Sequence, residues 1–263
     1  MNEGDGVGSR KAAAFDLSGK VALVTGGGSG IGAGISTVLA EAGATVVIAD
    51  RDEAGARREV AGLTAAAHTA GAVNLDLADE ASVLRGCAEV VTRYGAPWLL
   101  VNNAGVQDRE ALLEATVAEW DRIHSINARG AFLMTREIAR AMVAAGTGGR
   151  IVNISSTCVK APMVVGLAAY SSSKGGLLAL SQTAAFELVE HGITVNTVLP
   201  GGVMTPGAMA ARGPTIGGPA RRRPPLGMCE PRDIGAAVLF FASPAARFVT
   251  NQSIAVDGGF SLT

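Results

Sequence analysis

Tyr170 and Lys174, in the stretch AYSSSKGG at residues 169–176, stand four positions apart. Four residues make about one helical turn, so in a helix both side chains lie on one face. A phenol beside an ammonium can transfer protons. The phenol has an ordinary pKa of about 10, roughly three units too high for a base in alcohol oxidation near neutrality. Lowering it by three units requires roughly 4 kcal/mol, which a cation about 4 Å away can supply. The other interpretation is a structural tyrosine and a solvated lysine, which is the commoner origin of an isolated Y-x-x-x-K pattern.

The stretch VTGGGSGIG at residues 24–32 is a second candidate chemical feature. It separates a predicted strand at 21–26 from a predicted helix at 30–42, and its glycines let the backbone turn sharply and approach a ligand closely. The start of the helix offers free N–H groups to a pyrophosphate. An ordinary structural turn is the alternative. We predict a dinucleotide-binding turn formed by Gly26, Ser29, Gly30, Ile31 and Gly32.

Asp50 closes the next predicted strand, residues 44–50. A carboxylate at this position can accept both ribose hydroxyls of a bound adenosine, and it would repel the 2′-phosphate of NADP by roughly 4 kcal/mol at about 4 Å. Arg51 argues the other way, because a guanidinium can bind that phosphate. The glycine turn contains no basic residue that could provide a second phosphate contact. The predicted cofactor is therefore NAD.

The composition restricts the class of protein. With 263 residues, 48% of them apolar, the chain fits one large domain, and a net charge of −1 offers no surface for nucleic acid or an anionic membrane. No apolar run approaches the roughly 18 residues of a membrane span. The spacing of the cysteines and histidines suggests neither a metal site nor a triad, so we predict reduced thiols in a cytoplasmic, metal-free protein. These residues are Cys87, Cys158, Cys229, His68, His124 and His191.

Short β-branched segments alternate with longer Ala- and Leu-rich segments, which predicts an α/β fold with a doubly wound, seven-stranded parallel sheet. The predicted strands span residues 21–26, 44–50, 72–76, 98–104, 150–155, 193–200 and 253–258, and the predicted helices 30–42, 79–94, 116–145, 170–191 and 231–243. Residues 1–16 are predicted to form a flexible tail. The Gly-, Pro- and Arg-rich segment 205–227 is predicted to be a substrate lid or a disordered insertion.

Six motifs occur in an order that resembles the short-chain dehydrogenase/reductase (SDR) family, in its compact single-domain branch. They are TGGGSGIG (25–32), NNAG (102–105), IVNISS (151–156), Y-x-x-x-K (170–174), LPGGVMTP (199–206) and NQSIAVDGG (251–259). The resemblance covers residues 17–263 as a single domain. It implies a Rossmann-type sheet that binds a nicotinamide dinucleotide at the carboxyl ends of its strands, in agreement with the strands predicted from the residues themselves.

The resemblance also implies roles for particular residues. Tyr170 would transfer the proton, Lys174 would tune it, and Asn127 would organise a water relay to the lysine. A serine would hydrogen-bond the substrate oxygen. Further implied cofactor contacts are Asp76 and Leu77 at the adenine, Asn103, Ala104 and Gly105 at the border of the site, and Val203 and Thr205 at the nicotinamide carboxamide. Tyr170, Lys174, Pro200 and Gly201 are also implied to contact the cofactor.

The identity of the substrate-binding hydroxyl is open between two residues. Alignment of the strand from Arg150 selects Ser156, whereas counting back from Tyr170 selects Thr157. The difference arises because Ser156 precedes Tyr170 by 14 positions, one more than is common in the family. We favour Ser156, with one residue inserted between it and Tyr170. Ser155 is predicted to face the sheet.

The side chains expected around a small-molecule substrate are mostly apolar. They favour a lipophilic secondary alcohol or ketone, either alicyclic, terpenoid or aromatic. Arg221–Arg223 could contact an anionic substrate, but a solvated basic face is favoured. The apolar residues are Val159, Pro162, Met163, Val164, Val165, Met204 and Met209.

Three functions compete. The first is an NAD-dependent alcohol dehydrogenase or ketone reductase. The family also contains β-ketoacyl-thioester reductases, which usually use NADPH and are therefore disfavoured by Asp50. A non-catalytic nicotinamide-binding regulator would be expected to lack the tyrosine or the lysine. Family members usually form dimers or tetramers, so the resemblance implies a homo-oligomer assembled through the helices at 116–145 and 170–191.

Overall fold

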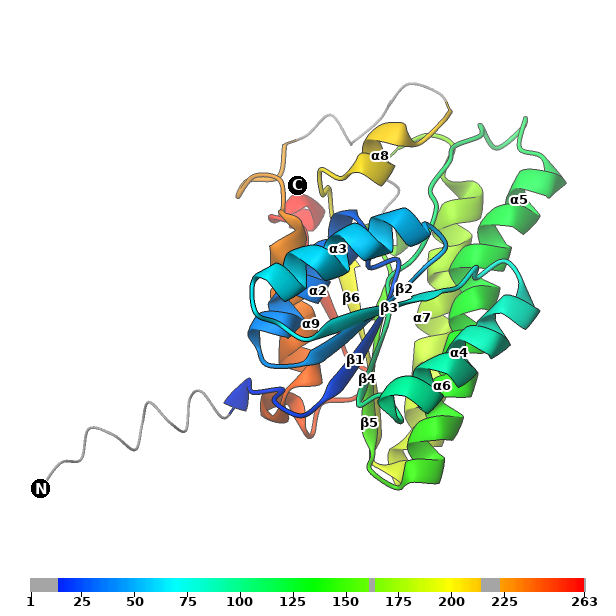
Figure 1. Ribbon diagram of the computed structural model, residues 1–263. Coiled ribbons are helices and arrows are strands. Elements are labelled where there is room, and N and C mark those ends of the chain that lie inside the picture. The colour runs from blue at the N-terminus through cyan, green and yellow to red at the C-terminus, as the bar shows by residue number, and fades with distance from the viewer. Residues whose placement is uncertain (1–13, 161–163, 214–222, 263) are drawn as a thin grey trace, which may run out of the picture.

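A single parallel sheet forms the centre of the molecule (Figure 1). The computed structural model describes residues 14–160, 164–213 and 223–262. The strands lie in the order β3-β2-β1-β4-β5-β6-β7, and every neighbouring pair is parallel. This confirms the predicted doubly wound α/β fold. The strands are β1 (Val21–Thr25), β2 (Thr45–Asp50), β3 (Ala70–Asn74), β4 (Leu99–Asn102), β5 (Gly149–Ile154), β6 (Ile193–Pro200) and β7 (Ser253–Val256).

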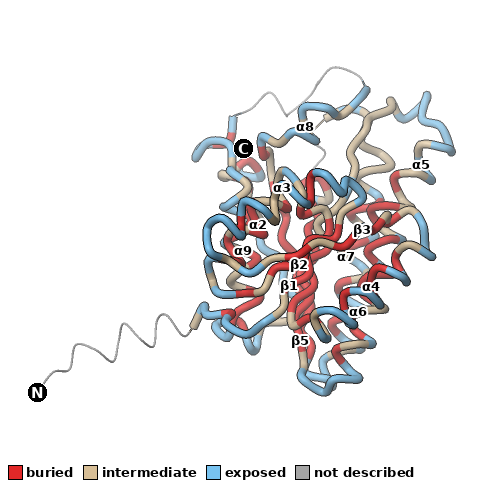
Figure 2. The backbone as a smooth tube through the Cα atoms, viewed as in Figure 1, coloured by how far each residue is buried: buried red, intermediate tan, exposed pale blue. Residues whose placement is uncertain are grey.

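Helices cover both faces of the sheet, and the central strands between them are almost entirely buried (Figure 2). One face carries a core that includes Ile35 and Phe241, and the other a core that includes Met134 and Ile151. Burial on both faces explains why the central strands are near-continuous apolar runs rather than alternating ones. The first face is covered by α2 (Gly30–Glu41), α3 (Glu53–Ala65) and α9 (Pro231–Ala242), and the second by α4 (Glu80–Tyr94), α6 (Ala131–Ala145) and α7 (Ala168–Leu188).

The chain reverses its direction of winding at the middle of the sheet. From β1 it proceeds to β2 and β3 on one side, and it then crosses to β4 on the other side of β1. At such a switch point the loops after the two strands diverge and leave a crevice at their carboxyl ends. The glycine turn follows β1 and the NNAG motif follows β4, so both flank this crevice.

The predicted strands are confirmed, each within two residues at either end, but three helical assignments differ. Helix α3 was not predicted, because it buries only Gly55, Ala56 and Leu63 and so lacks an apolar stripe. The predicted helix at 116–145 is divided into α5 (Val117–His124), a π-helical segment η1 (Ser125–Gly130) and α6. The predicted lid contains a short helix, α8 (Pro206–Ala210).

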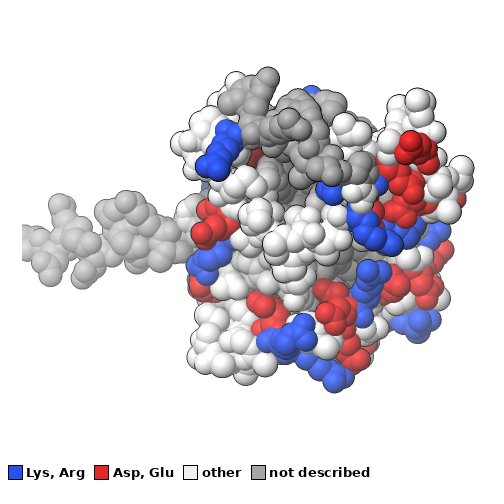
Figure 3. Space-filling view, turned by 90° about the horizontal axis from the view of Figure 1, so that it is seen from above, with Lys and Arg blue, Asp and Glu red and all other residues white. Residues whose placement is uncertain are grey.

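Some sequence predictions fall on residues outside those that the structure describes. They concern residues 1–13 of the predicted tail, residues 214–222 of the predicted lid with Arg221 and Arg222, and the pocket residues Pro162 and Met163. Figure 3 views the molecule from above, the side on which α8 lies in Figure 1. Among the described residues on this face, acidic and basic side chains are interspersed.

The close contact between α2 and α9 provides a test of the packing. A Cβ on Gly34 would lie 2.4 Å from Cβ of Pro231, whereas a Cβ on Gly62 of α3 would meet nothing within 4 Å. We expect Gly34→Ala to lower the free energy of unfolding by about 1–3 kcal/mol through overpacking. Gly62→Ala should raise it by roughly 0.5–1 kcal/mol, because alanine has the higher helix propensity. Urea denaturation measures both; equal stability of Gly34→Ala and the wild type would contradict the α2–α9 packing.

Candidate active site

Tyr170 and Lys174 lie on the first turns of α7, beside the carboxyl end of β5. The Lys174 amine is 5.9 Å from the centroid of the Tyr170 ring. Lys174 is only 3% exposed, and its Nζ donates a hydrogen bond of 2.8 Å to the carbonyl oxygen of Ile154. Among the described residues no carboxylate forms an ion pair with this amine. The two side chains therefore share one environment, with the ammonium held by a strand carbonyl.

Burial shifts the pKa of each group toward its neutral form. The pKa of Lys174 falls from its ordinary value near 10.5 to about 8, because desolvation disfavours the ammonium. The pKa of Tyr170 rises well above its ordinary value, chiefly through desolvation, with the charge of Cys158 adding to the rise and a hydrogen bond from Ser156 opposing it. The expected lowering of the phenol pKa by Lys174 is therefore not seen in the chain alone, where burial dominates the shift.

Three consecutive hydroxyl groups follow β5, and they point to different partners. The Ser156 hydroxyl accepts a hydrogen bond of 3.2 Å from the Cys158 N–H and also hydrogen-bonds the Tyr170 side chain. The Thr157 hydroxyl donates to the carbonyl oxygen of Pro200 at 3.3 Å. The Ser155 hydroxyl donates to the backbone oxygen of Lys174 at 3.0 Å, so it meets α7 through a specific bond. Of these three hydroxyl groups, that of Ser156 is the one that contacts the Tyr170 phenol.

Asn127 belongs to the π-helical segment η1, and π-helical turns inside α-helices frequently occur at functional sites. Its amide exchanges two hydrogen bonds of 2.9 Å with the backbone of Val106 and donates a third, of 3.0 Å, to the Ser173 hydroxyl. A Cβ on Gly105 would lie 3.1 Å from Oδ1 of Asn127 and 3.3 Å from Nζ of Lys174. The absence of a side chain at Gly105 thus lets the amide and the amine come close together.

The glycine turn has the geometry of an anion cradle. Gly26 and Gly30 have positive φ values of 65° and 54°, and a Cβ on Gly32 would lie 2.0 Å from the carbonyl oxygen of Gly26. Side chains are therefore excluded at these positions. Ser29 precedes α2 without a capping hydrogen bond from its side chain, and the first turn of α2 contains no acidic residue. The N–H groups of this first helical turn remain available to an anionic ligand.

The NNAG motif joins the ends of β1 and β4. The Asn103 amide donates to the carbonyl oxygens of Thr25 and Gly26 at 2.9 and 3.3 Å, and the Ala104 N–H donates to the Thr25 hydroxyl at 3.1 Å. A Cβ on Gly26 would lie 2.9 Å from Cα of Ala104. Asn103 and Ala104 therefore border the glycine turn and hold its first residue in place.

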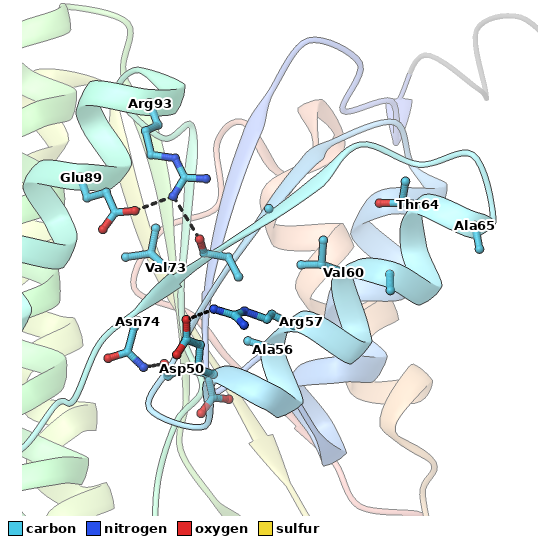
Figure 4. A pocket seen from close by; sticks show the side chains of 14 residues that line it. Asp50, Ala56, Arg57, Val60, Thr64, Ala65, Val73, Asn74, Glu89 and Arg93 are labelled. Atoms are coloured by element: carbon cyan, nitrogen blue, oxygen red, sulfur yellow. Dashed lines mark hydrogen bonds and ion pairs between the residues drawn. The ribbon is translucent and has the colours of Figure 1, made fainter.

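Asp50 lies at the end of β2, beside the glycine turn. Its Oδ2 accepts a hydrogen bond of 3.1 Å from the Gly28 N–H, and its Oδ1 accepts one of 2.9 Å from the Asp52 N–H. Arg51, by contrast, is exposed. Figure 4 shows Asp50 at one end of a hollow of about 860 Å³ between α3, β3 and α4. Tyr170, Lys174 and Ser156 do not line this hollow, so it is separate from the reacting groups.

The remaining predicted cofactor residues occupy two loops. The Asp76 carboxylate accepts from the Ala78 N–H at 2.9 Å, and buried Leu77 packs against Gly130 of η1. In the second loop, Thr205 lies over the glycine turn, because its Cβ is 3.2 Å from the position that a Cβ on Gly30 would take. The Thr205 hydroxyl caps α8 by accepting from the Ala208 N–H. Pro200 ends β6, Gly201 packs against Asp257, and Val203 forms an isolated bridge with Cys229.

Two features of the site were not predicted. Ser173 is fully buried and links Asn127 to the backbone oxygen of Tyr170; its place directly before Lys174 is a signal that could have been used. Asp108 accepts from the backbone N–H of Arg212 at 2.8 Å and pairs with the guanidinium of Arg122 at 2.5 Å. This contact ties the predicted lid to the loop after β4, and no local pattern reveals it.

The described residues contain no cluster of His, Cys, Asp and Glu arranged to bind a metal ion. None of the helices in the described part of the chain combines the length and apolar character of a membrane crossing.

Known proteins share this architecture. A family model described as "Enoyl-(Acyl carrier protein) reductase" matches residues 26–261. The (3R)-3-hydroxyacyl-CoA dehydrogenase of Canis lupus familiaris is 37% identical over 258 residues, which cover 94% of this chain and 98% of that protein. A 2,5-dichloro-2,5-cyclohexadiene-1,4-diol dehydrogenase of Sphingobium indicum is 36% identical over 247 residues, with coverage of 94% and 98%.

Solved structures agree with these relatives. A gluconate 5-dehydrogenase from Burkholderia cenocepacia, in complex with NADP and tartrate, superimposes with a TM-score of 0.87 at 31% identity and covers 96% of this chain and 99% of its own. A 3-ketoacyl-(acyl-carrier-protein) reductase from Brucella melitensis, complexed with NADH, has a TM-score of 0.85 at 35% identity, with coverage of 94% and 100%. The fold and the matches define a nicotinamide-dependent oxidoreductase class. The chain belongs to the short-chain dehydrogenase/reductase family.

The buried Lys174 amine predicts a pH-dependent stability. Between pH 8 and 10.5 the unfolded chain retains the proton that the folded chain has lost, so the folded state gains stability as the pH rises through this window. We expect the free energy of unfolding of the wild type to rise by about 2–4 kcal/mol relative to that of Lys174→Met across the window. Denaturant titrations at several pH values measure the difference. A difference in unfolding free energy that stays constant with pH would contradict the lowering of the Lys174 pKa by burial.

Proposed function

We propose that the chain is an NAD-dependent oxidoreductase that transfers a hydride between the nicotinamide and a secondary alcohol or its ketone. The observation that carries this proposal is the convergence of Tyr170, Lys174 and Ser156 at the carboxyl end of β5. These groups stand at the sheet edge where the glycine turn presents free N–H groups. A base, a cation and a polarising hydroxyl are the groups that alcohol oxidation requires.

The residues around the turn fit a dinucleotide. Gly26, Gly30 and Gly32 provide a cradle that side chains would fill, and the start of α2 suits a pyrophosphate. Asp50 would hold the adenosine ribose, Asp76 and Leu77 would lie near the adenine, and the segment from Pro200 to Thr205 near the carboxamide. When bound, NAD supplies the hydride acceptor or donor of the reaction.

The chain itself handles the proton. Tyr170 would accept a proton from the alcohol, or return it to the ketone, at its phenolic oxygen. Ser156, which lies beside the phenol, would turn its single hydroxyl proton toward the same substrate oxygen and hold it within reach. Lys174 would stabilise the phenolate, and Asn127, one glycine away from the amine, would organise water toward it. Because burial raises the phenol pKa, stabilisation by a second positive charge at the site is required.

Apolar side chains on the two segments predicted to line the substrate support a lipophilic substrate, such as an alicyclic, terpenoid or aromatic secondary alcohol. Met209 is 69% exposed, and Met204 and Val165 are also exposed. Large apolar side chains left open to solvent around a reacting centre are typical of a binding surface for an apolar ligand. The relative named for a chlorinated cyclohexadiene diol is consistent with this class. Arg223 is exposed, as expected of a solvated basic side chain.

A second candidate function is the oxidation or reduction of a 3-hydroxyacyl or 3-ketoacyl thioester. The names of two of the similar proteins favour it. A non-catalytic nicotinamide-binding role is less well supported, because all four of the residues Asn127, Ser156, Tyr170 and Lys174 are present and gathered at one place.

We further propose a homo-oligomer, either a dimer or a tetramer, in the cytoplasm. The outer face of α7 carries small residues and Phe186, which is 83% exposed, and such a face suits packing against a copy of itself. The small residues of this face are Ser172, Gly176, Ala179 and Thr183. Cys87, Cys158 and Cys229 are free thiols, consistent with a reducing compartment.

The catalytic proposal is tested by Tyr170→Phe. We expect wild-type protein with NAD⁺ to oxidise at least one of cyclohexanol, borneol and 1-phenylethanol, followed by the absorbance of the reduced cofactor. Removal of the hydroxyl should lower kcat by roughly 10²–10⁴-fold and leave the Kd of NAD⁺ within about threefold. Retained turnover in Tyr170→Phe would refute the mechanism. If the wild type oxidised 3-hydroxybutyryl-CoA but none of the three alcohols, the thioester function would be supported instead.

The cofactor proposal is tested by Asp50→Asn. Loss of the charge should reduce the preference for NAD over NADP, expressed as the ratio of their Kd values, by at least about 10-fold. Asp52→Asn is the matched control, because Asp52 caps α3 through the Gly55 N–H and does not bind the glycine turn. It should leave the ratio unchanged. A wild-type preference for NADP would contradict this reading of Asp50.

A further inference from the structure

Four consecutive residues at the end of β5 each contact α7. The Asn153 amide donates to the Ser181 hydroxyl at 2.7 Å, and the Ile154 carbonyl accepts from the Lys174 amine at 2.8 Å. The Ser155 hydroxyl donates to the backbone oxygen of Lys174 at 3.0 Å, and Ser156 hydrogen-bonds Tyr170. We call residues 153–156 the β5 docking segment. Together these bonds attach one face of α7 to the strand.

Lys174 is bound to this segment twice, through opposite ends of the residue. Its side chain reaches the carbonyl of Ile154, while its own backbone oxygen receives the hydroxyl of Ser155. Ser155 is 3% exposed, so this bond is shielded from water. A carbonyl oxygen has two lone pairs, so it can accept from a side chain in addition to the helical N–H. Ser155 thereby connects the helical turn that carries the amine directly to the strand.

This bond addresses a requirement that the Y-x-x-x-K spacing leaves open. The spacing sets the position of Tyr170 relative to Lys174 within the helix. It does not set the displacement of α7 along its own axis relative to β5. That displacement decides whether the phenol meets Ser156, because Tyr170 lies on α7 whereas Ser156 follows β5. Ser155 stands between the strand residue that holds the amine and the serine that meets the phenol.

We propose that Ser155 is a positioning residue for the reaction: its hydrogen bond to the Lys174 backbone holds α7 at the displacement that brings Tyr170 to Ser156. The inference rests on the proposed function. Ser155 does not itself contact the substrate, and its effect passes through the placement of Lys174 and Tyr170. A displacement of about 1 Å in such a site can lower the rate by roughly 10²-fold.

The test compares Ser155→Ala with Ser181→Ala, using NAD⁺ and whichever of cyclohexanol, borneol or 1-phenylethanol the wild type oxidises. Both serines are buried, and each links α7 to β5. Ser181, however, lies seven positions beyond Lys174, about 10 Å further along the helix. We expect Ser155→Ala to lower kcat at least about 10-fold, with KM for the alcohol and the Kd of NAD⁺ within about threefold. Ser181→Ala should keep kcat within about twofold despite its loss of stability.

Amide hydrogen exchange provides a readout that does not depend on turnover. In Ser155→Ala the amides around residues 172–178 should exchange at least about 10-fold faster, whereas in Ser181→Ala the increase should centre on residues 180–186. Equal kcat in Ser155→Ala and the wild type, or equal losses of kcat in both variants, would overturn the positioning role and leave the proposed function intact. Absence of turnover in the wild type with every substrate would instead refute the proposed function, and the positioning role with it.

Discussion

The site depends on one interaction, the hydrogen bond from the buried Lys174 amine to the carbonyl oxygen of Ile154. An ammonium in the interior is costly unless it is paired, and among the described residues no carboxylate pairs with this one. The strand carbonyl therefore provides its principal partner, and the pKa of Lys174 falls to about 8. Gly105 and the π-helical turn that carries Asn127 leave the amine room to occupy this position.

The same burial that lowers the pKa of Lys174 raises that of Tyr170. It raises the phenol pKa, so the chain alone keeps its proposed proton-transfer group protonated. A further positive charge at the site would lower the phenol pKa by stabilising the phenolate. Under the proposed function, the positive charge of the oxidised cofactor would therefore favour formation of the phenolate in the complex. Burial is thus the main cause of both pKa shifts, and it acts on Tyr170 and Lys174 alike.

The sequence predicts the sheet well because near-continuous apolar strands are a local property of buried parallel strands. It misses α3, whose few buried residues produce no stripe, and the π-helical turn, which leaves no periodic signature. The reacting residues are found from their motifs, but their environment is not. The hydrogen bonds from Ser155 and Asn127 to α7 join segments far apart in the chain, and only the folded arrangement of β5, η1 and α7 specifies them.

The ionisation of Lys174 is the most direct test of this account. The chain has only four lysines, Lys11, Lys20, Lys160 and Lys174, so an NMR titration of the side-chain ¹³Cε signals in ¹³C-lysine-labelled, cofactor-free protein can follow each of them. The signal absent from Lys174→Met identifies the residue. We predict that this amine titrates near pH 8, well below the ordinary value for lysine. A midpoint near 10.5, the ordinary value for lysine, would show that the amine is solvated and would contradict the proposed site.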